Sequence, residues 1–188
     1  YAYYDAYYLP TTLRISKTDT EGQTLAGVTF DITRITDDPQ NMATSANTAD
    51  SAEASAQNAG TGTFVTDENG LIVEKYLVSG IYEIRETSTL PGYILDETIR
   101  YFTVDENGFV FASDEKGLNL NADGRKSDTL TLTWVNDFTK WDFSKVDITG
   151  DKEIEGAKMQ ILDADGNIVY EWTSTESAHR ISRIPAGT

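Results

Sequence analysis

Three stretches of the chain alternate apolar and polar residues with the two-residue period of a β-strand, and each apolar face ends in a polar residue. The inward positions are Leu13, Ile15 and Lys17 in the first stretch, Tyr82, Ile84 and Glu86 in the second, and Leu130, Leu132, Trp134 and Asn136 in the third. A lysine directed into a core is costly unless it is paired with another group or reacts with one. The pattern therefore predicts that an amine, a carboxyl and a carboxamide meet in one core.

Further strands are predicted over residues 28–35, 64–76, 98–104 and 109–112, where apolar residues alternate or flank turn residues. Asn-Gly pairs at 69–70 and 107–108 favour tight turns, so a hairpin is expected around each of them. Helical periodicity is hard to find outside a short alanine-rich stretch near 49–59. The sequence thus predicts an all-β fold.

Two segments differ in composition from the predicted strands. Residues 1–12 begin with five of the ten tyrosines and are interpreted as an aromatic N-terminal linker, the end of a preceding domain or a cloning remnant. Residues 37–62 are rich in Ala, Ser, Thr and Asn and are predicted to be a solvated insertion, either disordered or containing a short helix. A ligand-binding role for either segment stays open.

An internal repeat divides the chain. Ser16-Lys17-Thr18-Asp19 returns as Ser144-Lys145-Val146-Asp147, residues 25–30 match 154–159, residues 71–73 resemble 167–169, and Gly80 would match Gly187. Residues 13–138 are therefore predicted to form one domain, and 139–188 the N-terminal part of a second. Lys145 is expected to be the nucleophile of the second repeat, with its partner strand absent from this chain.

The charge and the residue types exclude several functions. The net charge is −16 and the pI is near 4.3, which disfavours nucleic acids and anionic lipid surfaces. The chain contains no cysteine and a single histidine, His179, and its short acidic turns lack the distal glutamate of a calcium loop, so neither a metal nor a cofactor is expected. No apolar run is long enough to span a membrane, and the first residues do not look like a secretory signal.

Several short motifs, taken together, resemble one family. They are Lys17-x-Asp19, Leu25-x-Gly27-x-x-Phe30, Gly80-x-Tyr82-x-x-x-Glu86, Pro91-Gly92-Tyr93 and Asn136. The combination is similar to the collagen-adhesin B-type (CnaB) repeats, also called SpaA-like pilin domains, of Gram-positive surface proteins. In that family the proline stands one position earlier. The resemblance implies an immunoglobulin-like sandwich in reversed arrangement, followed here by a truncated second repeat. It also implies an isopeptide bond between Lys17 and Asn136 that Glu86 promotes.

The chemistry of such a bond explains why these residue types are needed. Burial lowers the pKa of an amine and raises that of a carboxyl, so Lys17 can attack as a neutral amine while Glu86 shuttles protons and ammonia leaves. Tyr82, Leu132 and Trp134 are expected to exclude water from the site. The alternative is that Lys17 and Glu86 form an unreactive salt bridge. Asp137 is a rival acceptor, but it falls on the opposite face from Trp134.

The resulting hypothesis is a structural stalk or pilin module of an adhesin or pilus, extracellular and anchored to the cell wall of a Gram-positive bacterium. Its expected partners are neighbouring repeats of the same polypeptide, other pilin subunits or a host extracellular protein. The crosslinking would occur once per molecule, so the chain is not expected to be an enzyme. A ligand-binding adhesin domain that recognises a host protein or glycan is the alternative, and a hydrolase is a third hypothesis without a convergent catalytic group.

Overall fold

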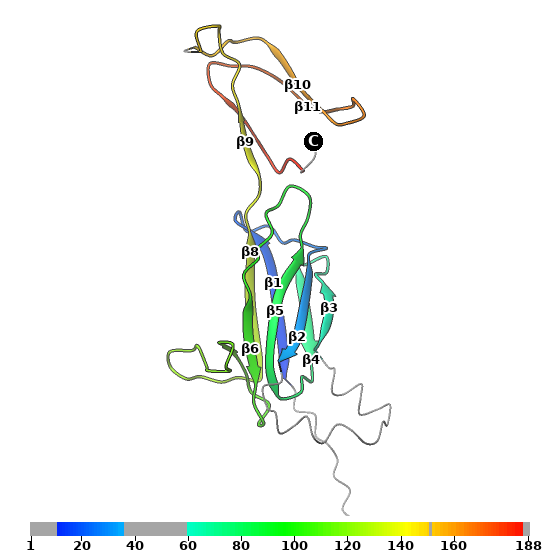
Figure 1. Ribbon diagram of the computed structural model, residues 1–188, viewed down its shortest axis with the longest axis vertical. Helices are drawn as coiled ribbons and strands as arrows, with labels where there is room; N and C mark the ends of the chain where they lie inside the picture. The colour runs from blue at the N-terminus through cyan, green and yellow to red at the C-terminus, as the bar shows by residue number, and fades with distance from the viewer. Residues whose placement is uncertain (1–10, 36–59, 151, 186–188) are drawn as a thin grey trace, which may run out of the picture. The chain divides into compact units, whose positions relative to one another are not determined.

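A computed structural model describes residues 11–35, 60–150 and 152–185, and all regular structure within these ranges is β (Figure 1). The chain divides into two compact units, one of Tyr1–Thr89 with Leu95–Val135 and the other of Leu90–Ile94 with Asn136–Thr188. The predicted all-β class is confirmed. Among the described residues, no helix is long and apolar enough to cross a membrane.

The first unit contains two sheets. A three-stranded sheet has the order β4-β1-β8, with the bounds Leu71–Lys75, Thr12–Asp19 and Thr129–Asn136. A five-stranded sheet has the order β3-β2-β5-β6-β7, with the bounds Gly62–Val65, Thr29–Ile35, Gly80–Ser88, Arg100–Val104 and Val110–Ser113. The sheets form an immunoglobulin-type sandwich, and Figure 1 shows their strands running lengthwise through this unit.

The core follows the two-residue period of the sequence. Leu13 and Ile15 on β1 are fully buried, as are Tyr82 and Ile84 on β5. The neighbouring positions on both strands are more exposed, as expected for strands with one face on the core. On β8 the burial is confined to the end of the strand, where Trp134 is fully enclosed.

One of the two predicted hairpins is wrong. β6 and β7 do pair around residues 105–108, but β3 pairs with β2 while β4 pairs with β1. The turn at 67–70 therefore carries the chain from one sheet to the other. Its local hydrogen bonds do not reveal this, because the Asp67 carboxylate accepts the N–H groups of Asn69 and Leu71 in the same way that the Asp105 carboxylate caps the true hairpin.

Gly70 allows this crossing turn to pack closely against β1. Its φ is +71°, and a Cβ atom there would lie 2.6 Å from the backbone oxygen of Lys17. Gly70→Ala is expected to cost about 1–3 kcal/mol of unfolding free energy for the left-handed backbone alone, with the steric overlap adding to that loss. The measurement is chemical denaturation of the full chain. Gly22→Ala is the matched control, because Gly22 has a φ of +84° and open space around it. Equal losses for both variants would contradict the close approach.

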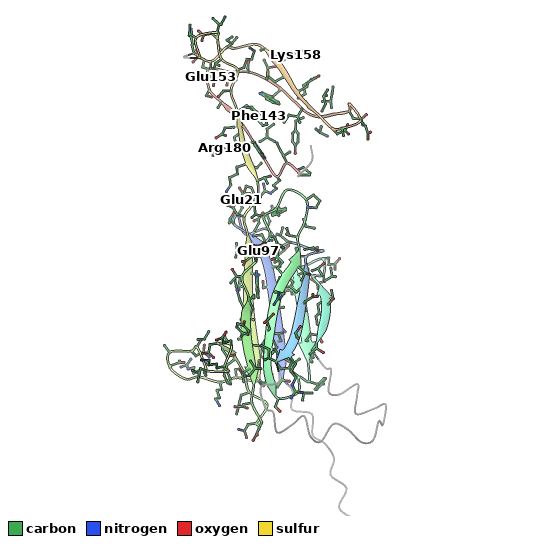
Figure 2. The ribbon with its side chains drawn as sticks, in the orientation of Figure 1. Glu21, Glu97, Phe143, Glu153, Lys158 and Arg180 are labelled. Atoms are coloured by element: carbon green, nitrogen blue, oxygen red, sulfur yellow. The ribbon has the colours of Figure 1, made fainter. Side chains whose placement is uncertain are left out.

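The second unit contains two pairs of strands. β9 (Lys140–Phe143) pairs with β12 (His179–Ser182), and β10 (Lys158–Leu162) pairs with β11 (Ile168–Thr173). The Trp172 ring stacks on His179 at 4.9 Å and lies 5.3 Å from Phe143, which ties β11 to the other pair. Arg180 forms a two-pronged ion pair with Asp142 across β9 and β12, and Figure 2 labels Arg180 and Phe143 on these strands.

The same hydrogen-bond pattern occurs in both units. A buried hydroxyl that follows one strand donates to a backbone carbonyl and accepts a backbone N–H from the loop before another strand. The two sets are Thr66 with Leu25 and Val28, and Ser174 with Ile154 and Ala157. By this pattern β11 corresponds to β3, and β12 pairs with β9 as β4 pairs with β1. The predicted match of 167–169 to 71–73 is therefore wrong.

Three of the sequence-based predictions concern residues that the structure does not describe. Most of the predicted insertion at 37–62, most of the linker at 1–12 and the match of Gly80 to Gly187 lie outside the described residues. At 90–93 the chain does turn despite the displaced proline, because the Tyr93 N–H donates to the Leu90 carbonyl and Gly92 has a φ of +82°.

Candidate functional site

Lys17 is a fully buried lysine. The alternation of β1 places it on the same face as Leu13 and Ile15, and its exposed fraction is 0%. Its Nζ donates to the Trp134 carbonyl at 3.4 Å and to the Thr18 carbonyl at 3.4 Å. A buried ammonium with neutral carbonyls as hydrogen-bond partners is poorly stabilised, so the charge requires an acidic partner nearby.

Glu86 is that partner. It lies on β5, directly opposite Phe30 of β2, and its side chain is fully buried. The distance from Lys17 Nζ to Glu86 Oε2 is 3.7 Å. The structure therefore brings together two of the three predicted site residues, which are 69 positions apart in the sequence (86 − 17).

Burial lowers the pKa of Lys17 below the ordinary value for lysine. The carboxylates of Glu86 and Asp96 act in the opposite direction, because they favour the charged amine, but desolvation dominates. The neutral amine, which is the form that can act as a nucleophile, is therefore more accessible at this position than in solvent.

Asn136 is the last residue of β8 and is 1% exposed. It shares a face with Trp134, whose carbonyl accepts the Lys17 hydrogen bond, and lies two residues, about 7 Å, further along the strand. Asp137 is on the other face, exposed, and paired with Lys140 at 2.7 Å. Of these two candidate acceptors, only Asn136 is buried.

The apolar enclosure of the site differs from the predicted one. Trp134 is fully buried and meets Phe30 edge-on at 5.2 Å, so Phe30 is part of the wall. Leu132 is only half-buried, because β8 lies at the edge of its sheet, and it does not seal the site. Tyr82 is buried, but its ring stacks on Phe102 at 4.6 Å. The sequence could have identified Phe30 as part of the wall, because it ends the Leu25-x-Gly27-x-x-Phe30 motif and falls on the inward face of its predicted strand.

Lys145 does not occupy a site comparable to that of Lys17. It is exposed and follows β9, which ends at Phe143. Its backbone N–H donates to Glu153, which Figure 2 labels, and its carbonyl accepts from Ile154. Lys145 therefore lacks the enclosure that surrounds Lys17, and its role as the nucleophile of the second repeat stays a prediction.

In the described part of the chain, no group of three or more His, Cys, Asp or Glu side chains could hold an ion. The carboxylates of the acidic turns accept backbone N–H groups instead, as Asp163 does from Asp165 and Asn167.

Comparison with known families identifies the family to which the chain belongs. The family model described as SpaA, prealbumin-like fold domain, matches residues 11–116, which is more than half of the sequence. The chain belongs to this family of SpaA prealbumin-like domains, and the resemblance to SpaA-like repeats is confirmed. Curated protein sequences gave no match.

Solved structures with similar folds include a protein of Bacillus anthracis, a major pilin and a fragment of a pilus adhesin. The Bacillus anthracis TIE protein is 18% identical, with a TM-score of 0.46, over 95% of this chain and 26% of its own. The major pilin SpaD of Corynebacterium diphtheriae is 20% identical, with a TM-score of 0.45, over 73% and 33%. A C-terminal fragment of the pilus adhesin SpaC of Lactobacillus rhamnosus GG is 17% identical, with a TM-score of 0.48, over 90% and 69%. The chain thus spans about a quarter of the TIE protein and a third of SpaD.

Proposed function

We propose that residues 13–138 are a structural module of a Gram-positive surface pilus or adhesin stalk, and that Lys17 and Asn136 become joined by an isopeptide bond. The observation that carries this proposal is the buried Lys17 amine, 3.7 Å from the buried Glu86 carboxyl and hydrogen-bonded to the β8 carbonyl two residues before Asn136. Lysine and glutamate are almost never fully buried unless they are paired, and burying such a pair carries a large desolvation cost.

The reaction exchanges one amide for another. A proton passes from the Lys17 ammonium to the Glu86 carboxylate, and the neutral Nζ then attacks Cγ of Asn136. Glu86 donates its proton to the developing oxyanion, accepts the proton that Nζ loses, and delivers it to the leaving Nδ2. It then takes back the oxyanion proton as the carbonyl re-forms. A new C–N bond forms as the old one breaks, and ammonia departs. Each molecule reacts once, without a cofactor, because the folded strands hold the groups together.

The bond would stabilise the module in two ways. It closes a loop of about 120 residues, which, by analogy with a disulfide, is worth roughly 4–5 kcal/mol. It also joins β1 to β8, which are neighbours in one sheet, so a pulling force would pass along covalent bonds instead of separating strands. Because the crosslink would be an amide and not a disulfide, it would be insensitive to thiol reductants.

The cellular setting follows from the same proposal. A force-bearing module with a strongly acidic surface suits an extracellular fibre anchored to the cell wall, with neighbouring repeats and other pilin subunits as partners. No described residue favours the alternative of a host-ligand site, since that hypothesis relied on segments 1–12 and 37–62. It stays a prediction.

Intact-mass spectrometry of the purified full chain tests the proposal. One crosslink is expected to lower the mass by about 17 Da, the mass of ammonia. Proteolysis should then yield a branched peptide that contains Lys17 and Asn136. Lys75→Ala, which removes an exposed lysine of the same sheet, should retain the mass loss. If the native protein had the full mass calculated from its sequence, without the loss of ammonia, Lys17 and Glu86 would form only a salt bridge.

A further inference from the structure

Arg100, the first residue of β6, contacts the last part of β8. Its guanidinium carbon lies 3.9 Å from the centre of the Trp134 ring. One terminal nitrogen donates to the Thr133 carbonyl at 2.5 Å, and the other lies 3.6 Å from the Asp96 carboxylate. One side chain thus connects the five-stranded sheet to both the backbone and a side chain of β8.

The Trp134 ring needs such a contact to be held in place. The indole is fully buried, but its N–H has no hydrogen-bond partner among the described residues. Its orientation therefore depends on packing, to which the Phe30 ring and the Arg100 guanidinium both contribute. β8 lies at the edge of its sheet, with β1 as its neighbour in that sheet, and the Arg100–Thr133 hydrogen bond adds a backbone contact from the other sheet.

We propose that Arg100 is a positioning residue for the crosslinking reaction: it holds Trp134 and the end of β8 so that the Asn136 carboxamide is presented to Lys17. This inference rests on the proposed function. The connection is direct, because the Trp134 carbonyl accepts the Lys17 hydrogen bond and Asn136 follows two residues later. A small rotation of β8 would move the carboxamide by the ångström or so that separates productive from unproductive geometry.

Arg100 also affects the charge balance at Lys17. The charged groups that act on the amine are Glu86 and Asp96, which raise its pKa, and Arg100, which lowers it. Removing the guanidinium should therefore raise the pKa of Lys17 and reduce the fraction of neutral amine at a given pH. The pH dependence of the crosslinking rate should then move toward higher pH, a change that a merely structural role would not produce.

The test is a refolding time course on the full chain. The polypeptide is recovered unfolded in concentrated urea, its full mass is checked, and it is diluted into native buffers on both sides of neutrality while the loss of ammonia is followed by mass. Arg100→Met is expected to crosslink about tenfold more slowly than the native chain, with its pH profile moved upward. Arg100→Lys keeps a charge but not the planar fork, so it should restore the pH profile while the rate stays below that of the native chain.

Arg85→Met is the matched control, because it removes an exposed arginine from β5 and should react at the native rate. The inference is overturned if Arg100→Met reacts at the native rate, or if Arg85→Met slows the reaction equally. If circular dichroism shows that Arg100→Met does not fold, the Arg100→Lys variant tests the inference instead. A native crosslinking rate in Arg100→Lys also overturns it. A native chain that never loses mass refutes the proposed function itself, which is a different outcome.

Discussion

Lys17→Ala is expected to lower the melting temperature of the first unit by on the order of 15 °C, because it removes a crosslink worth about 4–5 kcal/mol. It should also restore the full mass of the chain. The variant leaves the Glu86 carboxyl buried without its amine, which adds to the loss. Differential scanning calorimetry and intact mass on the same sample measure both effects.

Asn136→Ala separates the two contributions. It prevents the bond but keeps the buried pair of Lys17 and Glu86, so its melting temperature should lie between those of the native chain and Lys17→Ala. Lys75→Ala, at an exposed position on β4, should melt as the native chain does. If Lys17→Ala also melted at the native temperature, the amine would have to be peripheral to the stability of the sandwich.

Glu86→Ala is expected to fold, yet to keep its full mass. General acid–base catalysis contributes typically 10²–10⁴-fold, so the crosslinking rate should fall by roughly that factor. Glu86→Gln, which preserves the shape of the side chain without the titrating proton, should behave in the same way. The measurement is the mass of folded protein over days, with folding verified by circular dichroism.

Glu83→Gln is the control for this experiment. Glu83 lies on the same strand, pairs with Arg85, and its side chain is 20% exposed. This variant should crosslink as the native chain does. Prompt loss of ammonia from Glu86→Gln would remove Glu86 from the mechanism and leave proximity alone as the driving force.

The core of the first unit could be predicted from the period of its strands. Lys17, Glu86 and Asn136 each extend an apolar face, and burial of all three follows from alternation along β1, β5 and β8. The proximity of Lys17 to Glu86 required more than periodicity, since pairing between distant strands is not encoded locally. The family motifs provided that information.

Other features were inaccessible or overlooked. The crossing at 67–70 could not be distinguished from a hairpin, because both kinds of turn use the same aspartate caps and differ only in which distant strand pairs afterwards. Arg100 could have been found. It shares its strand face with Phe102 and Val104, both buried, so alternation places its side chain on the core side of β6.

The connection between β2 and β3 has a consequence for engineering. β2 ends at Ile35 and β3 begins at Gly62, yet the two strands are hydrogen-bonded neighbours, and in the second unit the corresponding pair is joined by residues 163–167. Loop-closure entropy grows only with the logarithm of loop length, so strand pairing at this place tolerates connections of very different size. Foreign peptides grafted between Ile35 and Gly62 should therefore be displayed without loss of the sandwich, which makes this end of the domain a natural position for epitope presentation.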